Sequence, residues 1–178
     1  MQFLKPKTGW GVLAIIVGWQ VIGMLFFTLG PYAQIIDLNA GVMPEESFGY
    51  SADELKSWLT NLADSGRDLY QQFQLFDVVN AAVTATALTA GLSFTLSRLF
   101  PANKKVQLIK YVPGLVFVLE LLENLLLFIN TANFPNPSMV GLASTVTMIK
   151  LTLGFGSMIL FLVTAIWALI KFRTHSTA

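Results

Sequence analysis

Cysteine is absent from this chain of 178 residues. Its absence excludes disulfides, thiol redox chemistry and metals bound by thiolates. Histidine is almost absent as well, because the single one, His175, lies in the C-terminal tail. That position argues against a haem, chlorophyll or zinc ion ligated by histidine inside the fold. We therefore expect no cofactor and no metal.

Charged residues are also scarce, at 12% of the chain against roughly a quarter in an average soluble domain. Three stretches contain none at all, and a fourth is interrupted only by two glutamates: 10–29, 78–96, 151–170 and 111–129. A helix needs about 20 apolar residues to cross the hydrocarbon core of a bilayer. With a net charge of +1, nothing in the composition indicates a nucleic-acid partner. The composition instead makes the lipid bilayer the first expected partner.

We predict an all-α, polytopic membrane protein with four transmembrane helices in one antiparallel bundle. The predicted helices cover about 9–30, 73–98, 108–130 and 139–171. The fourth is this long if 139–150 is helical, and an interfacial turn ending at Lys150 is the alternative. The first is longer than the apolar core of a secretory signal, roughly 7–15 residues, so we expect it to be retained.

Basic residues are distributed unevenly around these helices. Eight of the eleven flank the helix ends that would share one side of the membrane: Lys5, Lys7, Arg98, Lys104, Lys105, Lys110, Lys171 and Arg173. In the connection 31–70, on the other side, most of the charged residues are acidic. Loops rich in lysine and arginine stay in the cytoplasm. Both termini are therefore predicted to be cytoplasmic.

The outer region 31–72 begins with an irregular Gly/Pro-rich segment and contains a predicted short helix, 52–63. Ser51 and Glu54 have the spacing of a capping box, in which each side chain satisfies a free backbone N–H at the helix start. The helix has an apolar stripe at helical spacing, formed by Leu55, Trp58, Leu59 and Leu62. This stripe is expected to lie on the lipid interface or cap the bundle, with partner binding as the alternative. We expect Gly66 to end the helix.

The polar residues in the middle of the third predicted helix are Glu120, Glu123 and Asn124. Their spacings of three and four place them on one helical face. A carboxylate at the bilayer centre costs roughly 2.5–3.5 kcal/mol, so this face must point into the bundle. We predict an intramembrane polar cluster that also includes Gln20, Thr84, Thr86 and Ser157. The cluster is either an interhelical hydrogen-bond network or a proton, cation or headgroup site.

Four other polar residues are predicted to mark the outer boundary of the membrane: Arg67, Asp77, Asn80 and Lys150. Asp77 and Lys150 are expected to lean outward and reach the water between headgroups. No cation is then expected at the depth of the glutamates, unless Lys150 bends inward or Arg67 folds over the top. At least one glutamate is accordingly expected to be protonated.

Two segments of the chain resemble an uncharacterised group of bacterial four-helix integral membrane proteins. They are "GRDLYQQFQLFD", which carries Gly66, Arg67, Tyr70 and Asp77, and "LELLENLLL", which carries the two glutamates and Asn124. The resemblance implies a multi-pass protein of the bacterial inner, or cytoplasmic, membrane. It also implies that Arg67 and Asp77 are partners. The group has no established activity to carry over.

No nucleophile triad, metal cluster or cofactor motif occurs in the sequence. The favoured function is therefore a non-catalytic one, as an accessory, assembly or scaffold subunit of a membrane complex. Its partners would be other membrane-protein subunits or further copies in a homo-oligomer. The alternative is proton- or cation-coupled transport or sensing of a small molecule through the glutamate pair. An enzyme acting on lipid, with the acids as general acid and base, is a third hypothesis without a predicted catalytic residue.

Overall fold

The structure is a computed structural model that describes residues 9–38 and 42–175. Within these ranges it is helical, with no strand. Lys5 and Lys7, which contributed to the predicted topology, lie outside the described residues. Four helices are long and apolar enough to cross a membrane: α1 (Gly9–Leu29), α4 (Ala63–Leu99), α6 (Val112–Ala132) and α7 (Val140–His175). The protein is thus a candidate multi-pass membrane protein.

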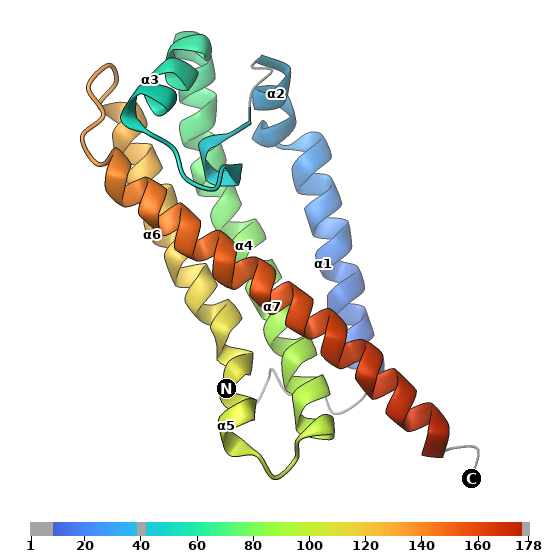
Figure 1. Ribbon diagram of the computed structural model, residues 1–178. Coiled ribbons are helices and arrows are strands. Elements are labelled where there is room, and N and C mark those ends of the chain that lie inside the picture. Colours follow the sequence, from blue (N-terminus) through green and yellow to red (C-terminus); the bar gives the residue numbers. More distant parts are fainter. Residues whose placement is uncertain (1–8, 39–41, 176–178) are drawn as a thin grey trace.

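Three of the long helices form the centre of the molecule. α4, α6 and α7 pack against one another, and α1 lies along α4 on one side. Figure 1 shows α7 crossing diagonally in front of the other long helices. The short helices α2 (Pro31–Leu38), η1 (Pro44–Glu46) and α3 (Ala52–Asn61) gather at the end where α4 begins. At the opposite end, α5 (Lys104–Gln107) and η2 (Leu108–Tyr111) connect α4 to α6.

The α4–α7 contact depends on small residues. Gly91 lies so close to α7 that a Cβ atom at this position would overlap the Phe161 ring. Nearby, the hydroxyl groups of Thr95 and Thr164 are hydrogen bonded at 2.9 Å. Small side chains let two backbones approach closely in lipid, where no hydrophobic effect drives helices together. The glycine is therefore required by the packing.

The short outer helix caps the end of the long helices. The capping box is confirmed, because the Ser51 hydroxyl accepts from the Glu54 N–H and the Glu54 carboxylate accepts from the Ser51 N–H. The apolar stripe of α3 is buried in a core that α4, α6 and α7 complete. Fully burying a large apolar side chain contributes roughly 1.5–3 kcal/mol. The stripe thus packs against other helices of this chain and caps their end.

The helix that follows α3 begins earlier than predicted. α4 starts at Ala63, ten residues before the predicted start at 73, and Gly66 lies inside it. The chain instead turns at Ala63, whose φ of 57° lies in the left-handed region. A Cβ on Gly66 would lie 3.1 Å from the Leu62 Cβ and 3.4 Å from a Leu38 methyl group. Gly66 therefore permits close packing and does not end a helix.

Two further predictions concern local structure. α7 begins at Val140 as one long helix, in agreement with the favoured reading of 139–150. The segment after α1 was predicted to be irregular, but it starts with the helix α2. Pro31 occupies the first position of that helix, where its missing N–H has no intrahelical partner to lose. The proline therefore opens a helix in a segment that was expected to be irregular.

Candidate functional site

The polar face of α6 points into the protein. Glu123 has an exposed fraction of 0%, Asn124 is buried, and the side chain of Glu120 is largely buried. Spacings of three and four residues bring all three side chains to one side of the helix. That side faces α4 and α7, the two helices on which α6 packs.

Lys150 of α7 lies against this face. Its Nζ atom donates to the Glu120 Oε1 at 3.0 Å and also to the Glu123 Oε2, and the residue is only 7% exposed. The expectation that Lys150 leans outward to headgroup water is therefore wrong, and the alternative in which it bends inward is the one that the structure contains. α7 begins at Val140, so Lys150 is about 15 Å from the helix start at 1.5 Å per residue.

Thr147 joins the same cluster. It lies three residues before Lys150 on α7, and its hydroxyl donates to the Glu123 Oε1. Glu123 is thereby bound at both oxygens, by Thr147 and by Lys150. The sequence analysis did not select Thr147, although its spacing from Lys150 could have indicated a shared face.

Asp77 of α4 completes the cluster from the third helix. Its Oδ1 accepts from the Asn80 amide at 3.4 Å and its Oδ2 from the Asn124 amide at 3.3 Å. Asp77 is 8% exposed, so its predicted outward orientation is also wrong. Asn80 lies beside it as a hydrogen-bond partner, not as a boundary residue. Among the described residues Asp77 has no salt bridge.

Arg67 is not the partner of Asp77, contrary to what the resemblance implied. Its guanidinium donates to the Leu59 carbonyl at 2.8 Å and pairs with Asp64. It also stacks over the Phe134 ring at 4.1 Å. Ten residues separate Arg67 from Asp77, which is about 15 Å along a helix. Arg67 thus lies near α3 at the end where α4 begins, whereas Asp77 lies in the interior.

The remaining predicted members of the cluster divide into two groups. Thr84 and Ser157 line a cavity next to the charged residues. Gln20 and Thr86 are exposed and lie outside the cluster, so their inclusion was wrong. Gln20 belongs to α1, which packs along α4 away from α6. Equal depth in the membrane placed these residues in one layer, but only the helix packing decides which of them meet.

Another buried acid, Glu45, comes from η1 in the outer region. It accepts from the Tyr70 hydroxyl at 2.8 Å and from the Gln74 amide at 3.2 Å. Burial, reinforced by the negative charge of Glu123, raises the pKa of Glu45 to about 8. The sequence carries no signal for this burial, because a Pro-Glu-Glu triplet in a connection is typical of a solvated loop.

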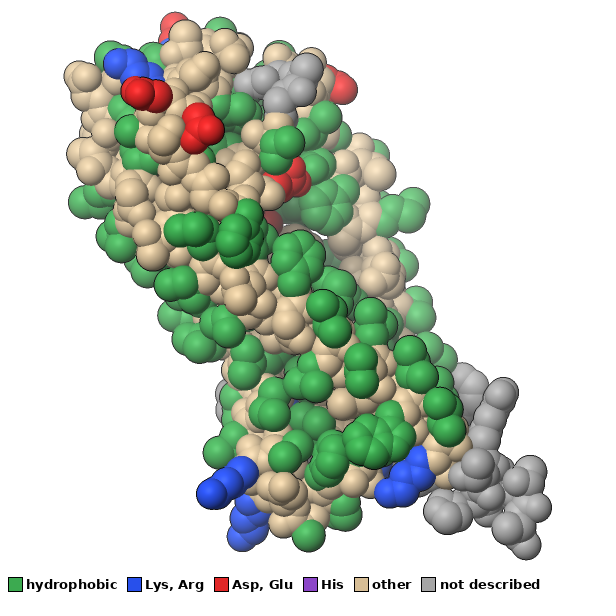
Figure 2. Space-filling view, in the orientation of Figure 1, with side chains coloured by type: hydrophobic (Ala, Val, Ile, Leu, Met, Phe, Trp, Pro, Cys, Tyr) green, Lys and Arg blue, Asp and Glu red, His purple; other side chains and the backbone are tan. Residues whose placement is uncertain are grey.

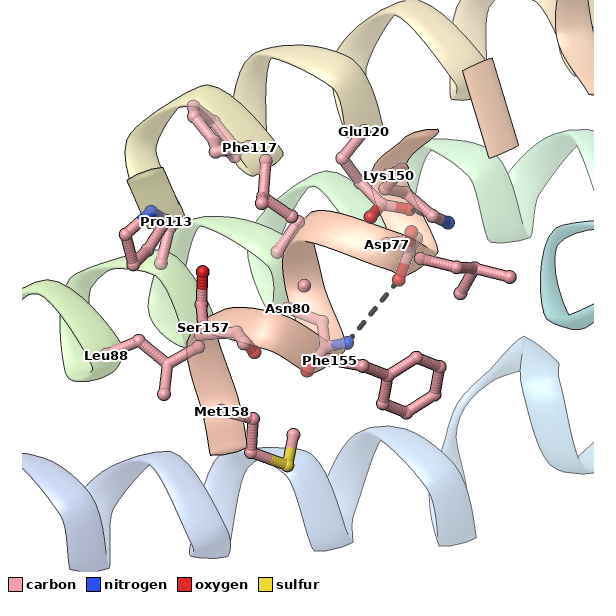
Figure 3. Close-up of a pocket in the computed structure, with 16 residues that line it drawn as sticks. Asp77, Asn80, Leu88, Pro113, Phe117, Glu120, Lys150, Phe155, Ser157 and Met158 are labelled. Atoms are coloured by element: carbon pink, nitrogen blue, oxygen red, sulfur yellow. Dashed lines mark hydrogen bonds and ion pairs between the residues drawn. The ribbon is translucent and has the colours of Figure 1, made fainter. Parts of the chain in front are cut away.

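The cavity lies between α4, α6 and α7 and has a volume of about 210 Å³. Asp77, Asn80, Glu120 and Lys150 form one end (Figure 3). Figure 3 shows the Asp77 and Glu120 carboxyl groups close together beside Lys150. The rest of the lining is largely apolar and includes Leu88, Pro113, Phe117, Phe155 and Met158. Such a combination of an apolar pocket with a few convergent polar groups is typical of small-molecule sites.

The charges around the cavity do not balance. Among the described residues, three acids, Asp77, Glu120 and Glu123, lie around one cation, Lys150. In the same part of the chain, no group of three acidic, histidine or cysteine side chains is placed to hold a metal ion. An excess of carboxyl groups over ammonium groups can hold a proton or an organic cation.

Comparison with known proteins adds no assignment. No family model, curated protein or solved structure matches this chain. The functional argument accordingly rests on the cavity and the charged residues that line it.

Proposed function

We propose that this protein is a multi-pass membrane protein that binds a proton or an organic cation at the intramembrane cluster of Asp77, Glu120, Glu123 and Lys150, and couples that binding to transport or sensing of a small molecule. The observation that carries the proposal is the excess of acids over Lys150 beside a cavity. Ionisable groups within the membrane are costly, and those that pair in an interior cavity commonly mark proton or ion pathways.

The proposal includes a topology. The four long helices would form an antiparallel bundle in a bacterial inner membrane, with both termini in the cytoplasm. Its support is the charge distribution, since Figure 2 shows Lys and Arg side chains at the end that carries α5 and acidic side chains near the end that carries α2 and α3. Lysine- and arginine-rich loops remain on the cytoplasmic side.

The experiment that tests the function is an infrared pH titration of the purified protein in lipid nanodiscs. The carbonyl stretch of a carboxyl group distinguishes its protonated form from its ionised form. Between about pH 5 and about pH 9, exposed acids are already ionised because their pKa values lie near 4. We expect a protonation change in this range that is lost in Glu120→Gln.

Two controls make the titration specific. Asp64→Asn removes an exposed outer acid and is expected to leave the signal unchanged. Glu45→Gln removes the contribution of the acid in the outer region, whose pKa lies within the same range. If Glu120→Gln retains the full signal, the cluster does not exchange protons and this form of the proposal is wrong.

A second candidate function is supported by a different observation. Only 6% of the α1 span and 17% of the α7 span are buried within the chain. Large apolar faces are thus available to other subunits or to a second copy, as expected for an accessory or scaffold subunit. Native mass spectrometry of the protein released gently from its own membrane tests this candidate. A fixed stoichiometry with other chains would favour it, and a protein released alone would count against it.

A further inference from the structure

We propose that the cavity receives the ammonium group of an amphipathic amine that enters from the lipid bilayer. This inference rests on the proposed function and names the chemical class of its ligand. Asp77 and Glu120 would provide the counter-charge, and the aromatic and aliphatic residues of the cavity would surround the first carbons of the chain.

The first argument concerns charge. Of the two carboxylates that line the cavity, Glu120 already receives Lys150 at 3.0 Å. Asp77 receives two asparagine amides, at 3.3 and 3.4 Å, and lies within hydrogen-bonding reach of Glu120. An amide donates a hydrogen bond but cancels no charge. The carboxyl groups of Asp77, Glu120 and Glu123 thus outnumber the one ammonium group beside them, even if two of them share a proton. A ligand cation would supply the positive charge that the amides lack. An anion would be repelled by the two carboxylates at the same end of the cavity.

The second argument concerns the lining beyond the charged end. Phe117 and Phe155 both line the cavity, and Val116 and Met158 lie beside them. The face of an aromatic ring attracts an ammonium group, most strongly where water is excluded. The same residues suit the methylene groups next to the charge. The lining therefore matches a molecule that is cationic at one end and apolar at the other.

The third argument concerns access. Phe155 is 60% exposed and Met158 36% exposed, although both belong to the middle of a helix long enough to span the membrane. Figure 3 shows these two side chains on the side of the cavity that faces α1, and Figure 2 shows a hollow on the face of the molecule where α7 crosses. Trp19 of α1 donates to Thr84, a lining residue, at 2.9 Å and so holds α1 beside the cavity. The opening thus lies where lipid chains would surround the protein.

The fourth argument concerns size. The cavity volume of about 210 Å³ is below the roughly 300–1,000 Å³ of sites for drug-sized ligands. A headgroup with its first few carbons fits this volume, whereas a whole amphipathic molecule does not. The rest of the chain would remain among the lipids between α1 and α7.

The test uses the full-length protein in micelles of an uncharged maltoside detergent at neutral pH. Three probes with the same eighteen-carbon chain are compared by native mass spectrometry: stearylamine, stearic acid and stearyl alcohol. We expect one stearylamine per protein chain and much weaker retention of the acid and the alcohol. Preferred retention of stearic acid would overturn the proposal and make Lys150 the recognition group. Equal retention of all three would show apolar partitioning only and would also overturn it.

Variants locate the binding. Asp77→Asn removes a carboxylate and is expected to weaken stearylamine binding by about tenfold, because a hydrogen bond to a charged group is worth roughly one factor of ten or more. Ala85→Leu fills the cavity without changing its charge and is expected to weaken binding to a similar degree. Ala82→Leu on the same helix is the matched control, since Ala82 does not line the cavity. Binding that is unchanged in Ala85→Leu would place the amine elsewhere and overturn the proposal.

The two proposals fail in distinguishable ways. If stearylamine does not bind but the infrared titration shows the protonation change, the site exchanges protons and only the ligand class is wrong. If the titration shows no change in the wild type or its variants and stearylamine still binds, the site holds an organic cation without proton coupling. Thermal unfolding of each variant shows whether it is folded. If Asp77→Asn does not fold, a folded Ala85→Leu protein still tests whether the amine binds in the cavity.

Discussion

Lys150 of α7 donates to Glu120 of α6 at 3.0 Å in the interior of the protein, across thirty residues of chain. The same ammonium group reaches Glu123, which is fully buried. Two helices are thus joined by one cation and two acids. The proposed cation site depends on this contact, because it decides which charges lie beside the cavity.

Removal of the cation is expected to be costly. Lys150→Met leaves both glutamates without their partner and should destabilise the protein by about 3–5 kcal/mol, the cost of breaking a buried ion pair from one side. The triple variant Lys150→Met, Glu120→Gln and Glu123→Gln removes the unpaired charges as well, so most of the loss should be recovered. Unfolding in mixed micelles with an increasing fraction of denaturing detergent measures the stability of the single and the triple variant. Lys56→Met, on the exposed outer helix, is the control. A Lys150→Met protein as stable as that control would contradict the pairing.

Docking of the outer region is expected to depend on pH. Glu45 has a pKa of about 8 in the folded protein, raised above its ordinary value near 4.5 by burial. Between these values the folded state binds the proton more tightly than the open state does. Stability of the docked region is therefore greatest at low pH and is lost as the pH rises toward 8, by about 5 kcal/mol in total at 1.36 kcal/mol per unit of pKa shift.

Hydrogen exchange of α3 measures this effect, because α3 packs in the core that also contains Tyr70, the hydrogen-bond donor to Glu45. We expect faster exchange of α3 amides at about pH 8 than at about pH 6, after correction for the intrinsic dependence of exchange on pH. Glu45→Gln should remove the difference, and Glu46→Gln, whose carboxylate bonds Tyr32 at 2.8 Å in an exposed position, should not. A residual difference of full size in Glu45→Gln would assign the effect to another group.

The close approach of α4 and α7 predicts a steric effect. Gly91→Ala places a Cβ against the Phe161 ring and should destabilise the protein by about 1–3 kcal/mol, as overpacking of a tight interior does. Phe161→Leu in the same chain should restore part of the loss. Gly156→Ala on α7 is the matched control, since a Cβ there meets nothing within 4 Å. Equal thermal unfolding temperatures for the two alanine variants would contradict the packing.

The turn between α3 and α4 predicts a stabilising substitution. Ala63 has a φ of 57°, a conformation that costs an L-residue roughly 1–2 kcal/mol. Glycine adopts it without that cost, so Ala63→Gly should stabilise the protein by about 1 kcal/mol after the entropy of the unfolded chain is included. Ala63→Val should act in the opposite direction, because β-branched residues tolerate positive φ least. The order of thermal unfolding temperatures, Gly above Ala above Val, is the expected result.

Several features follow from the sequence because they are local. The long apolar stretches predict the four membrane-length helices, since length and composition alone decide whether a helix can cross a bilayer. The capping box of Ser51 and Glu54 involves residues three positions apart, and the structure contains it. The shared face of Glu120, Glu123 and Asn124 follows from helical periodicity. Periodicity also shows that this face must be buried, but not what it meets.

The partners of that face were decided only by tertiary packing. Lys150 was expected to lean outward, and only the packing of α7 on α6 directs its ammonium group to Glu120 and Glu123. Asp77 and Asn124 lie 47 positions apart, and Glu45 reaches the interior from a connection with no periodic signal. Composition and spacing by themselves determined that this chain has four membrane-length helices and an acidic face on the third. Which cation meets those acids depends on how the helices are rotated and aligned against one another, and that information exists only once α4, α6 and α7 have packed together.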